Sequence, residues 1–216
     1  VEYNMPGMSQ SQVRPEIGYT FATGLRTTLR QDPDVIMVGE IRDKETAGLA
    51  IQAALTGHLV FSTIHTNNSI GVIPRLLDMG VDPYLIPPTL ILAIAQRLVK
   101  TLCPNSGKSI PVEGSIKLMI EKQLADLPAQ CRSQIPLGKD VLEAMPSAEC
   151  PKGTRGRTAV MEVLEMNRDL EAAILKSASE AEMIKIARTQ GMLTMKEDAL
   201  AKAFRHEIPF EEVNEL

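Results

Sequence analysis

The sequence lacks a segment that could cross a membrane as a helix, and it has few aromatic residues. Its most apolar run, YLIPPTLILAIA at 84–95, is too short to span a bilayer and is followed at once by Gln96 and Arg97. We therefore interpret this run as a buried helix. Trp is absent, whereas Met occurs 11 times, which favours a helix-rich core of aliphatic side chains.

Cysteine is also scarce. Cys103, Cys131 and Cys150 are odd in number and widely spaced, which does not resemble a disulfide framework and favours a reducing compartment. Zinc sites use Cys-x-x-Cys pairs, but Ser106 and Gly153 stand where the second cysteine of each pair would be. We therefore expect no bound metal.

Positive charge is not in excess either. The 216 residues carry a net charge of -4, which argues against a protein that coats nucleic acid, so we expect no nucleic-acid partner. No signal peptide opens the chain, and a start at VEYNMPG without Met suggests a fragment.

The first part of the chain alternates between helical and strand-like patterns. Helices are predicted at 16–31, 44–56 and 70–79, and apolar strands without alternation at 35–39 and 59–64. This order predicts an α/β domain with a parallel sheet whose strands are buried on both faces. In such sheets, ligands bind beyond the carboxyl ends of the strands.

Polar residues follow both predicted strands. They are Glu40, Arg42, His65, Thr66 and Asn67, so we expect them to share one rim of the sheet. A carboxylate such as Glu40 after a buried strand is typical of a Walker B element, where it orients the attacking water or holds a Mg²⁺-bound water. A lone glutamate there is more often a solvated charge, and its neighbours favour the functional interpretation.

Basic and imidazole side chains extend this candidate site. Arg26 and Arg30, four residues apart on one helix face, could neutralise a phosphoryl group or simply face solvent. His65, at the end of the second strand, could reach a γ-phosphate. His58, at its start, fits a core or capping histidine better.

A phosphate-binding loop is missing. NSGKS at 105–109 resembles one, but Leu102 stands where the first glycine is required, and no strand precedes it. No other Gly-rich loop ends in Lys followed by Ser or Thr.

From about residue 101 the sequence is rich in turn-forming residues and no longer alternates between helical and strand-like patterns. We divide the sequence into 1–100, a turn-rich insert at 101–156, and a mostly helical 157–216 that opens with a strand-like run at 158–166. In the tail, Ser179 with Glu182 and Thr194 with Glu197 form capping boxes, each predicting a helix start.

The run LRTTLRQDPDVIMVGEIRDKETAGLAIQAALTGHLVFSTIHTN, 25–67, resembles the secretion ATPase family of type II secretion and type IV pilus assembly. The resemblance continues through RLLDMGVDPYLI, AQRLVKTLCP, GRTAVMEVLEM and GMLTMKEDALAK, and so covers nearly the whole chain. It implies the core of a RecA-like P-loop NTPase with a parallel sheet, followed by an insert and a helical C-terminal subdomain.

The resemblance also implies residue roles. VIMVGE matches an atypical Walker B element, with Gly39 where other P-loop ATPases have Asp and with Glu40 as the acid. Glu2 matches the last carboxylate of the family's Asp box. Which carboxylate acts as the general base stays open.

The remaining implied roles concern phosphate. TGHLVFSTIHT matches the His box, with His58 and His65. Arg26 and Arg30 match phosphate-sensing arginines, and Arg157 matches another arginine placed toward nucleotide. Whether the arginines act within one subunit or across an interface stays open.

By the same resemblance, the chain is the C-terminal half of a motor that hydrolyses ATP with Mg²⁺, as a ring that is expected to be a hexamer. The motor would act on an inner-membrane platform protein and be cytoplasmic, held at the membrane by partners. Pilus assembly and type II secretion are not distinguished.

Two departures qualify this expectation. The family's Walker A lies upstream of the chain, so the fragment alone is expected to be inactive. The insert keeps the place of a four-cysteine zinc unit, which favours the extension branch, but half of the ligands are gone. The alternative function is a non-hydrolysing regulatory or interaction module of the same ring.

Overall fold

A computed structural model describes residues 3–104, 106–133 and 135–216. The chain packs as two compact units. Unit 1 contains the residues up to Thr66, Gly71–Ile91 and Ile174–Ser177, and unit 2 contains Asn67–Ile70, Leu92–Ala173 and Ala178–Leu216. The predicted segments 101–156 and 157–216 both contribute to unit 2. None of the helices in the described residues is long and apolar enough to cross a bilayer.

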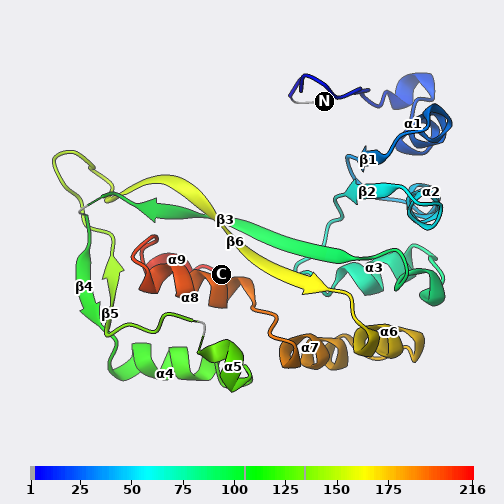
Figure 1. The fold of residues 1–216 in the computed structure, drawn as a ribbon. Coiled ribbons are helices and arrows are strands. Elements are labelled where there is room, and N and C mark those ends of the chain that lie inside the picture. Colours follow the sequence, from blue (N-terminus) through cyan, green and yellow to red (C-terminus); the bar gives the residue numbers. More distant parts are fainter. Residues whose placement is uncertain (1–2, 105, 134) are drawn as a thin grey trace. The chain divides into compact units, whose positions relative to one another are not determined.

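Unit 1 alternates helices and strands in the order that the sequence predicts (Figure 1). Its elements are η1 (Pro15–Ile17), α1 (Phe21–Thr28), η2 (Leu29–Gln31), β1 (Val35–Val38), α2 (Lys44–Leu55), β2 (Leu59–Ser62), α3 (Val72–Asp78) and η3 (Pro83–Leu85). The strands β1 and β2 pair in parallel, from Val35 opposite Leu59 to Val38 opposite Ser62. The predicted α/β class with a parallel sheet is therefore confirmed.

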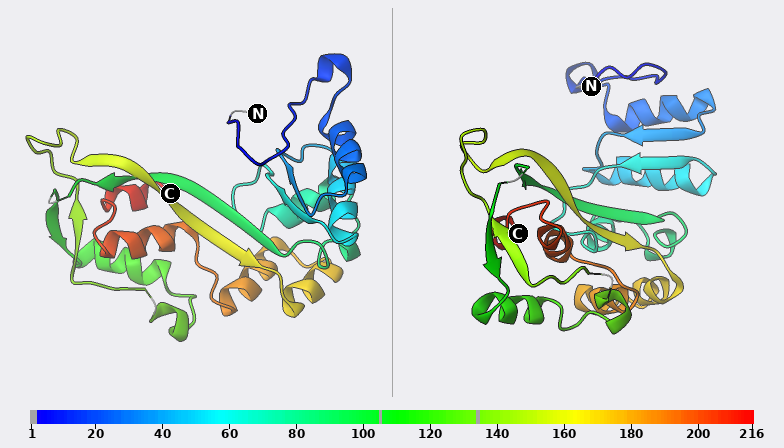
Figure 2. Two further views of the ribbon diagram at one scale, coloured as in Figure 1. Left: turned by 45° about the horizontal axis from the view of Figure 1, so that its top comes forward. Right: turned by 60° about the vertical axis from the view of Figure 1, so that its left-hand side comes forward.

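The sheet of unit 1 is buried on one face only, so the prediction of two buried faces is wrong. Ile36 and Val38 pack against Leu25 and the alanines of α2. Met37, which points to the other face, is 71% exposed. The reason is that α1 and α2 both pack on the inward face, and no described segment of unit 1 covers the other (Figure 2).

The helix predicted at 16–31 is interrupted. After η1, Gly18 adopts a left-handed conformation with φ of 77°, and α1 begins only after Thr20. Thr20 caps α1 by accepting a hydrogen bond from the backbone N–H of Thr23. Arg26 therefore lies in the last turn of α1, whereas Arg30 lies in the tighter turn of η2 that follows.

Unit 2 is built on a long antiparallel ribbon of β3 and β6 (Figure 1). Its elements are β3 (Leu92–Leu102), β4 (Lys108–Pro111), α4 (Gly114–Gln123), α5 (Ala129–Arg132), β5 (Asp140–Glu143), β6 (Thr154–Glu165), α6 (Arg168–Leu175), α7 (Glu180–Thr189), α8 (Met195–Phe204) and α9 (Glu211–Asn214). β4 pairs with β5 in a second antiparallel sheet. The last residues of α6 belong to unit 1.

The prediction of a buried helix at 84–95 is wrong. Pro87 and Pro88 lie in a turn, and β3 begins at Leu92. At the start of β3 burial alternates as in a strand, since Ala93 is buried between Leu92 and Ile94, which are 46% and 54% exposed. Pairing with β6, far away in the sequence, supplies the backbone hydrogen bonds.

The insert at 101–156 shares a core with the tail. Ile120 and Leu124 of α4 and Val141 of β5 belong to the same buried cluster as Leu200 of α8 and Val160 of β6. The insert is therefore stabilised by packing against the tail. Both predicted capping boxes are confirmed, at the starts of α7 and α8.

Cys103 and Cys150 form a disulfide, so the expectation that the cysteines are unpaired is wrong. Because Leu102 of β3 lies opposite Thr154 of β6, the ribbon brings the two ends of the insert together. Ser106 Oγ also donates a hydrogen bond to the carbonyl oxygen of Met145, at 2.6 Å. Ser106 Oγ also lies 3.4 Å from Gly153 O, so the four positions that two Cys-x-x-Cys pairs would occupy lie together, although only two of them are cysteines.

Gly153, at one of those four positions, adopts a left-handed conformation with φ of 68°. A Cβ atom there would lie 2.7 Å from the backbone nitrogen of Met145, a distance that a side chain cannot accept without movement of the backbone. The approach of the two backbones therefore requires glycine.

Candidate functional site

The backbone around Glu40 is held by hydrogen bonds from the neighbouring strand. Beyond the ends of β1 and β2, Ile41 N donates to Thr63 O at 2.9 Å, and Thr63 Oγ1 donates to Gly39 O at 2.7 Å. Glu40 lies between these two bonds. Its position at the carboxyl end of β1 is therefore fixed by both strands.

Gly39 lies next to the ring of Phe21. A Cβ atom at Gly39 would stand 3.2 Å from Phe21 Cε1, which is tighter than ordinary van der Waals contact. An aspartate at this position would require the ring to move by a few tenths of an ångström. Glycine before Glu40 is therefore matched to the packing of α1 on the sheet.

The side chains of Arg42 and His65 both contact the Glu40 carboxylate. Its Oε2 accepts a hydrogen bond from Arg42 Nε, and His65 Nε2 lies 3.3 Å from the same oxygen. The side chain of Glu40 is only 19% exposed, whereas those of Arg42 and His65 are mostly exposed. Three residues of the predicted rim, Glu40, Arg42 and His65, therefore lie together at the ends of the two strands, whereas Asn67 belongs to unit 2.

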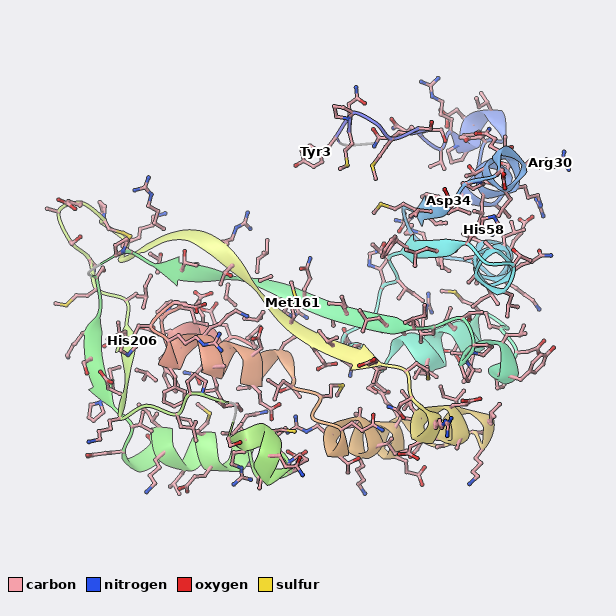
Figure 3. All side chains as sticks on the ribbon, viewed as in Figure 1. Tyr3, Arg30, Asp34, His58, Met161 and His206 are labelled. Carbon is pink, nitrogen blue, oxygen red and sulfur yellow. A yellow bond between two sulfur atoms is a disulfide. The ribbon has the colours of Figure 1, made fainter. Side chains whose placement is uncertain are left out.

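His58 lies at the opposite end of β2 from His65 (Figure 3 labels His58). Its Nδ1 is 3.0 Å from Ala53 O and 3.2 Å from Thr56 Oγ1, both at the end of α2. Gly57 follows α2 with φ of 100°, as expected for a helix stop. His58 thus occupies the capping position that its place in the sequence favours.

In the part of the chain that the structure describes, neither Arg26 nor Arg30 forms a hydrogen bond or ion pair with Glu40. Arg26 Nη2 donates to Glu45 Oε1 at 2.5 Å, and both side chains are about half exposed. Exposed ion pairs contribute only about 0–1 kcal/mol, so a competing anion could displace Glu45 at little cost. Arg30 is exposed in η2 (Figure 3).

The remaining candidates do not belong to this cluster. Arg157 is exposed on β6 in unit 2, opposite Lys100 of β3. Glu2 lies outside the described residues. The structure thus brings together Glu40, Arg42 and His65.

Sequence reasoning missed the partner of Arg26 and a buried carboxylate in β6. Glu45 lies in the first turn of α2, a position that is ordinary for a helix start. Glu162 is only 5% exposed and alternates with the buried Val160 and Leu164. That alternation is a signal, since it places a charge in phase with the buried side of a strand.

The carboxylate of Glu40 is the kind of ligand that Mg²⁺ uses. Mg²⁺ is commonly bound by one or two carboxylates together with water and substrate phosphates, and Glu40 supplies one such oxygen ligand. Among the described residues, no group of three or more His, Cys, Asp or Glu side chains is placed to hold a metal without such help.

Comparison with known proteins is consistent with this geometry. Type II secretion system protein E of Xanthomonas campestris pv. campestris is 46% identical over 214 residues, which are 99% of this chain and 36% of that protein. The type IV pilus assembly ATPase PilB of Thermus thermophilus is 42% identical over 99% of this chain and 23% of its own length. The chain therefore spans well under half of these relatives.

Solved structures support the fold. The pilus retraction motor PilT with bound ADP matches with a TM-score of 0.58 and 26% identity, over 91% of this chain and 43% of that chain. The Legionella pneumophila ATPase DotB matches with a TM-score of 0.58 and 25% identity, over 90% of this chain and 41% of that chain. The expected RecA-like P-loop NTPase fold is confirmed.

The sequence profile of one family, described as Type II/IV secretion system protein, matches residues 1–215. With 46% identity to a relative over almost the whole chain, this match establishes that the chain belongs to the Type II/IV secretion system protein family.

Proposed function

We propose that the protein containing this chain hydrolyses ATP with Mg²⁺ and powers type IV pilus assembly or type II secretion. The observation that carries the proposal is the convergence of Glu40 and His65 at the carboxyl ends of two parallel strands, 3.3 Å apart. This is the edge of an α/β sheet at which ligands bind. The names of the relatives, a secretion protein and a pilus assembly ATPase, support the same process.

Glu40 orients the attacking water or holds a water bound to Mg²⁺. Its carboxylate is held at the end of β1 and is largely shielded from solvent. Little reorganisation of the carboxylate is therefore needed when the reaction takes place. Mg²⁺, when bound, would neutralise charge on the phosphates. Arg42, which donates to Glu40 Oε2, keeps the carboxylate in place.

His65 senses whether the γ-phosphate is bound, because its ring is exposed at the rim and contacts the Glu40 carboxylate. Arg26, Arg30 and Arg157 neutralise phosphate charge, from the same subunit or from a neighbour in the ring. His58 supports the site from the far end of β2, where it caps α2. Glu2 is a second candidate acid in the same reaction.

The working assembly is a homo-oligomeric ring, a hexamer, that acts on an inner-membrane platform protein. It is cytoplasmic and peripheral to the membrane, and its work is mechanical. Nucleic acid has no part in it, in line with the net charge of -4. A second candidate function is a non-hydrolysing regulatory or interaction module of the same ring.

The deciding experiment replaces Glu40 in the full-length protein that carries this chain. Glu40→Gln keeps the shape and removes the charge, so we expect kcat to fall by roughly a hundredfold or more while ATP binding survives. Glu121→Gln, on the exposed surface of α4, is the matched control and should be neutral. Hydrolysis by Glu40→Gln at the parent rate would show that Glu40 is not the catalytic carboxylate.

Two further measurements separate the candidate functions. The 216-residue chain by itself should bind ATP weakly and not turn it over, because backbone N–H groups of a phosphate loop supply most phosphate contacts. Titration calorimetry checks this, and micromolar binding would contradict it. A full-length protein that binds its ring neighbours but never hydrolyses ATP would favour the non-hydrolysing module.

A further inference from the structure

The segment that follows His65 is seated in unit 2, although the residues on both sides of it belong to unit 1. Unit 1 runs to Thr66 and resumes at Gly71, and the four residues Asn67–Ile70 between them pack with unit 2. Ser69 and Ile70 are each only 1% exposed. The strand end that carries His65 is therefore tied, within a few residues, to the other unit of the chain.

Two hydrogen bonds hold this segment to β6. Ser69 N donates to Glu162 Oε1 at 2.9 Å, and Ser69 Oγ donates to the same oxygen at 2.6 Å. Asn68 Nδ2 also donates to Glu180 Oε1, at 3.2 Å, at the start of α7. We call the pair of Ser69 and Glu162 the loop anchor.

Glu162 has no cationic partner to offset its burial. In the part of the chain that the structure describes, no ion pair includes it. A buried carboxylate is costly unless it accepts hydrogen bonds, and Ser69 supplies two. Removing the segment from β6 would therefore leave the buried Oε1 atom of Glu162 without these two hydrogen bonds.

We propose that the loop anchor couples the rim at Glu40 and His65 to unit 2, so that Ser69 and Glu162 act as positioning residues of the motor. This rests on the proposed function, in which His65 responds to the γ-phosphate. When His65 moves with the state of the nucleotide, the covalent chain from His65 to Ser69 carries that movement to the loop anchor. Since the segment cannot slide along β6 without breaking two buried hydrogen bonds, β6 follows.

The loop between the two residues is short. Only Thr66, Asn67 and Asn68 separate His65 from Ser69. His65 lies near Glu40, and Ser69 is hydrogen-bonded to Glu162. A displacement of His65 therefore acts on a segment that is anchored four residues further along the chain.

The test uses the full-length protein and compares Ser69→Ala with the parent. Ser69→Ala removes one of the two hydrogen bonds, and Glu162→Gln keeps an oxygen acceptor but removes the charge. We expect Ser69→Ala to lower kcat by roughly two- to thirtyfold, the range found for residues that carry coupling, while KM for ATP changes less than twofold. The kcat of Glu162→Gln should lie between those of the parent and of Ser69→Ala.

A second readout separates coupling from simple structural support. In the parent, a non-hydrolysable ATP analogue should change the hydrogen exchange of the β6 amides at Val160–Leu164, and in Ser69→Ala this response should disappear. Ser109→Ala is the matched control, because Ser109 Oγ also donates to a carboxylate, Asp140 Oδ2 at 2.6 Å, but is exposed. It should retain the response and the kcat of the parent.

The outcomes are distinct. If the parent hydrolyses ATP and Ser69→Ala keeps both its kcat and the nucleotide-dependent exchange, the coupling is overturned and the proposed function stands. If the parent neither binds nor hydrolyses ATP, the proposed function fails and the coupling fails with it. If Ser69→Ala does not fold, as circular dichroism would show, Glu162→Gln decides by the same two measurements.

Discussion

The Nε2 atom of His65 and the Oε2 atom of Glu40 lie 3.3 Å apart although 25 residues separate them in the sequence. Parallel pairing of β1 with β2 brings them together, because it places the carboxyl ends of both strands at one edge. The contact lies beyond the carboxyl ends of the two strands. A ligand at this edge would lie beside both side chains.

Replacing His65 should slow the reaction with little effect on stability. In the full-length protein, His65→Gln should lower kcat roughly ten- to a hundredfold, because an exposed imidazole is lost from the reacting centre and no core packing changes. Steady-state kinetics checks this. The control is His206→Asn, in the turn after α8 (Figure 3), where φ is 59° and asparagine is well tolerated. Equal losses in both variants would contradict a specific role for His65.

Reduction of the disulfide should destabilise unit 2. Cys103 and Cys150 close a loop across a sequence separation of 47, for which chain entropy gives a stabilisation of about 4 kcal/mol. Urea unfolding with and without a thiol reductant measures the difference. The variant with Cys103→Ser and Cys150→Ser should not respond to the reductant. Free thiols at both cysteines in non-reduced protein, seen by mass spectrometry, would contradict the bond.

Removing Arg188 should be among the most damaging changes in the tail. Its guanidinium donates to both oxygens of Glu197, at 2.5 and 2.6 Å, and Glu197 is fully buried. Arg188→Met would leave that charge unpaired and should lower the free energy of unfolding by about 3–5 kcal/mol. Asp126→Asn, which weakens the exposed side of the same cluster, should cost about 1 kcal/mol or less. Urea unfolding compares the two variants, and similar losses would show that burial of Glu197 is not the cause.

The contribution of Asp126 should fade in acid. The hydrogen bond from Arg188 holds the pKa of Asp126 below its usual value, against a smaller effect of burial that raises it. A carboxylate with a lowered pKa stabilises the fold fully above its unfolded pKa of about 3.9, and the contribution is lost as the pH falls through the folded pKa. The difference in unfolding midpoint between the parent and Asp126→Asn should therefore shrink below about pH 4. A difference that stays constant from neutral pH into this range would contradict the prediction.

Local signals in the sequence were sufficient for the helices of the tail. The Ser179 hydroxyl accepts from Glu182 N, and the Glu182 carboxylate accepts from Ser179 N, so the signal and the structure span the same four residues. The rim residues Glu40 and His65 were also predictable, because each directly follows an apolar run that forms a strand.

Features that depend on distant pairing were not predictable from local pattern. The run at 84–95 is apolar enough for a helix, and only its pairing with β6 makes its end, from Leu92 onward, part of a strand. The same pairing places Cys103 beside Cys150, which their spacing alone conceals. The partner of Glu162 was hidden for the same reason, since Ser69 lies 93 residues earlier in the chain.

Gly153 is a position that a cysteine cannot take without a change in the backbone. A cysteine here would need its Cβ where the backbone of Met145 now lies, and it would have to adopt a left-handed conformation. Such a substitution requires the loop from Met145 to Gly153 to rearrange, which would disturb the bond from Ser106 to Met145 as well. A Cys-x-x-Cys pair that begins at Cys150 therefore cannot be completed by a single substitution while this loop keeps its present backbone.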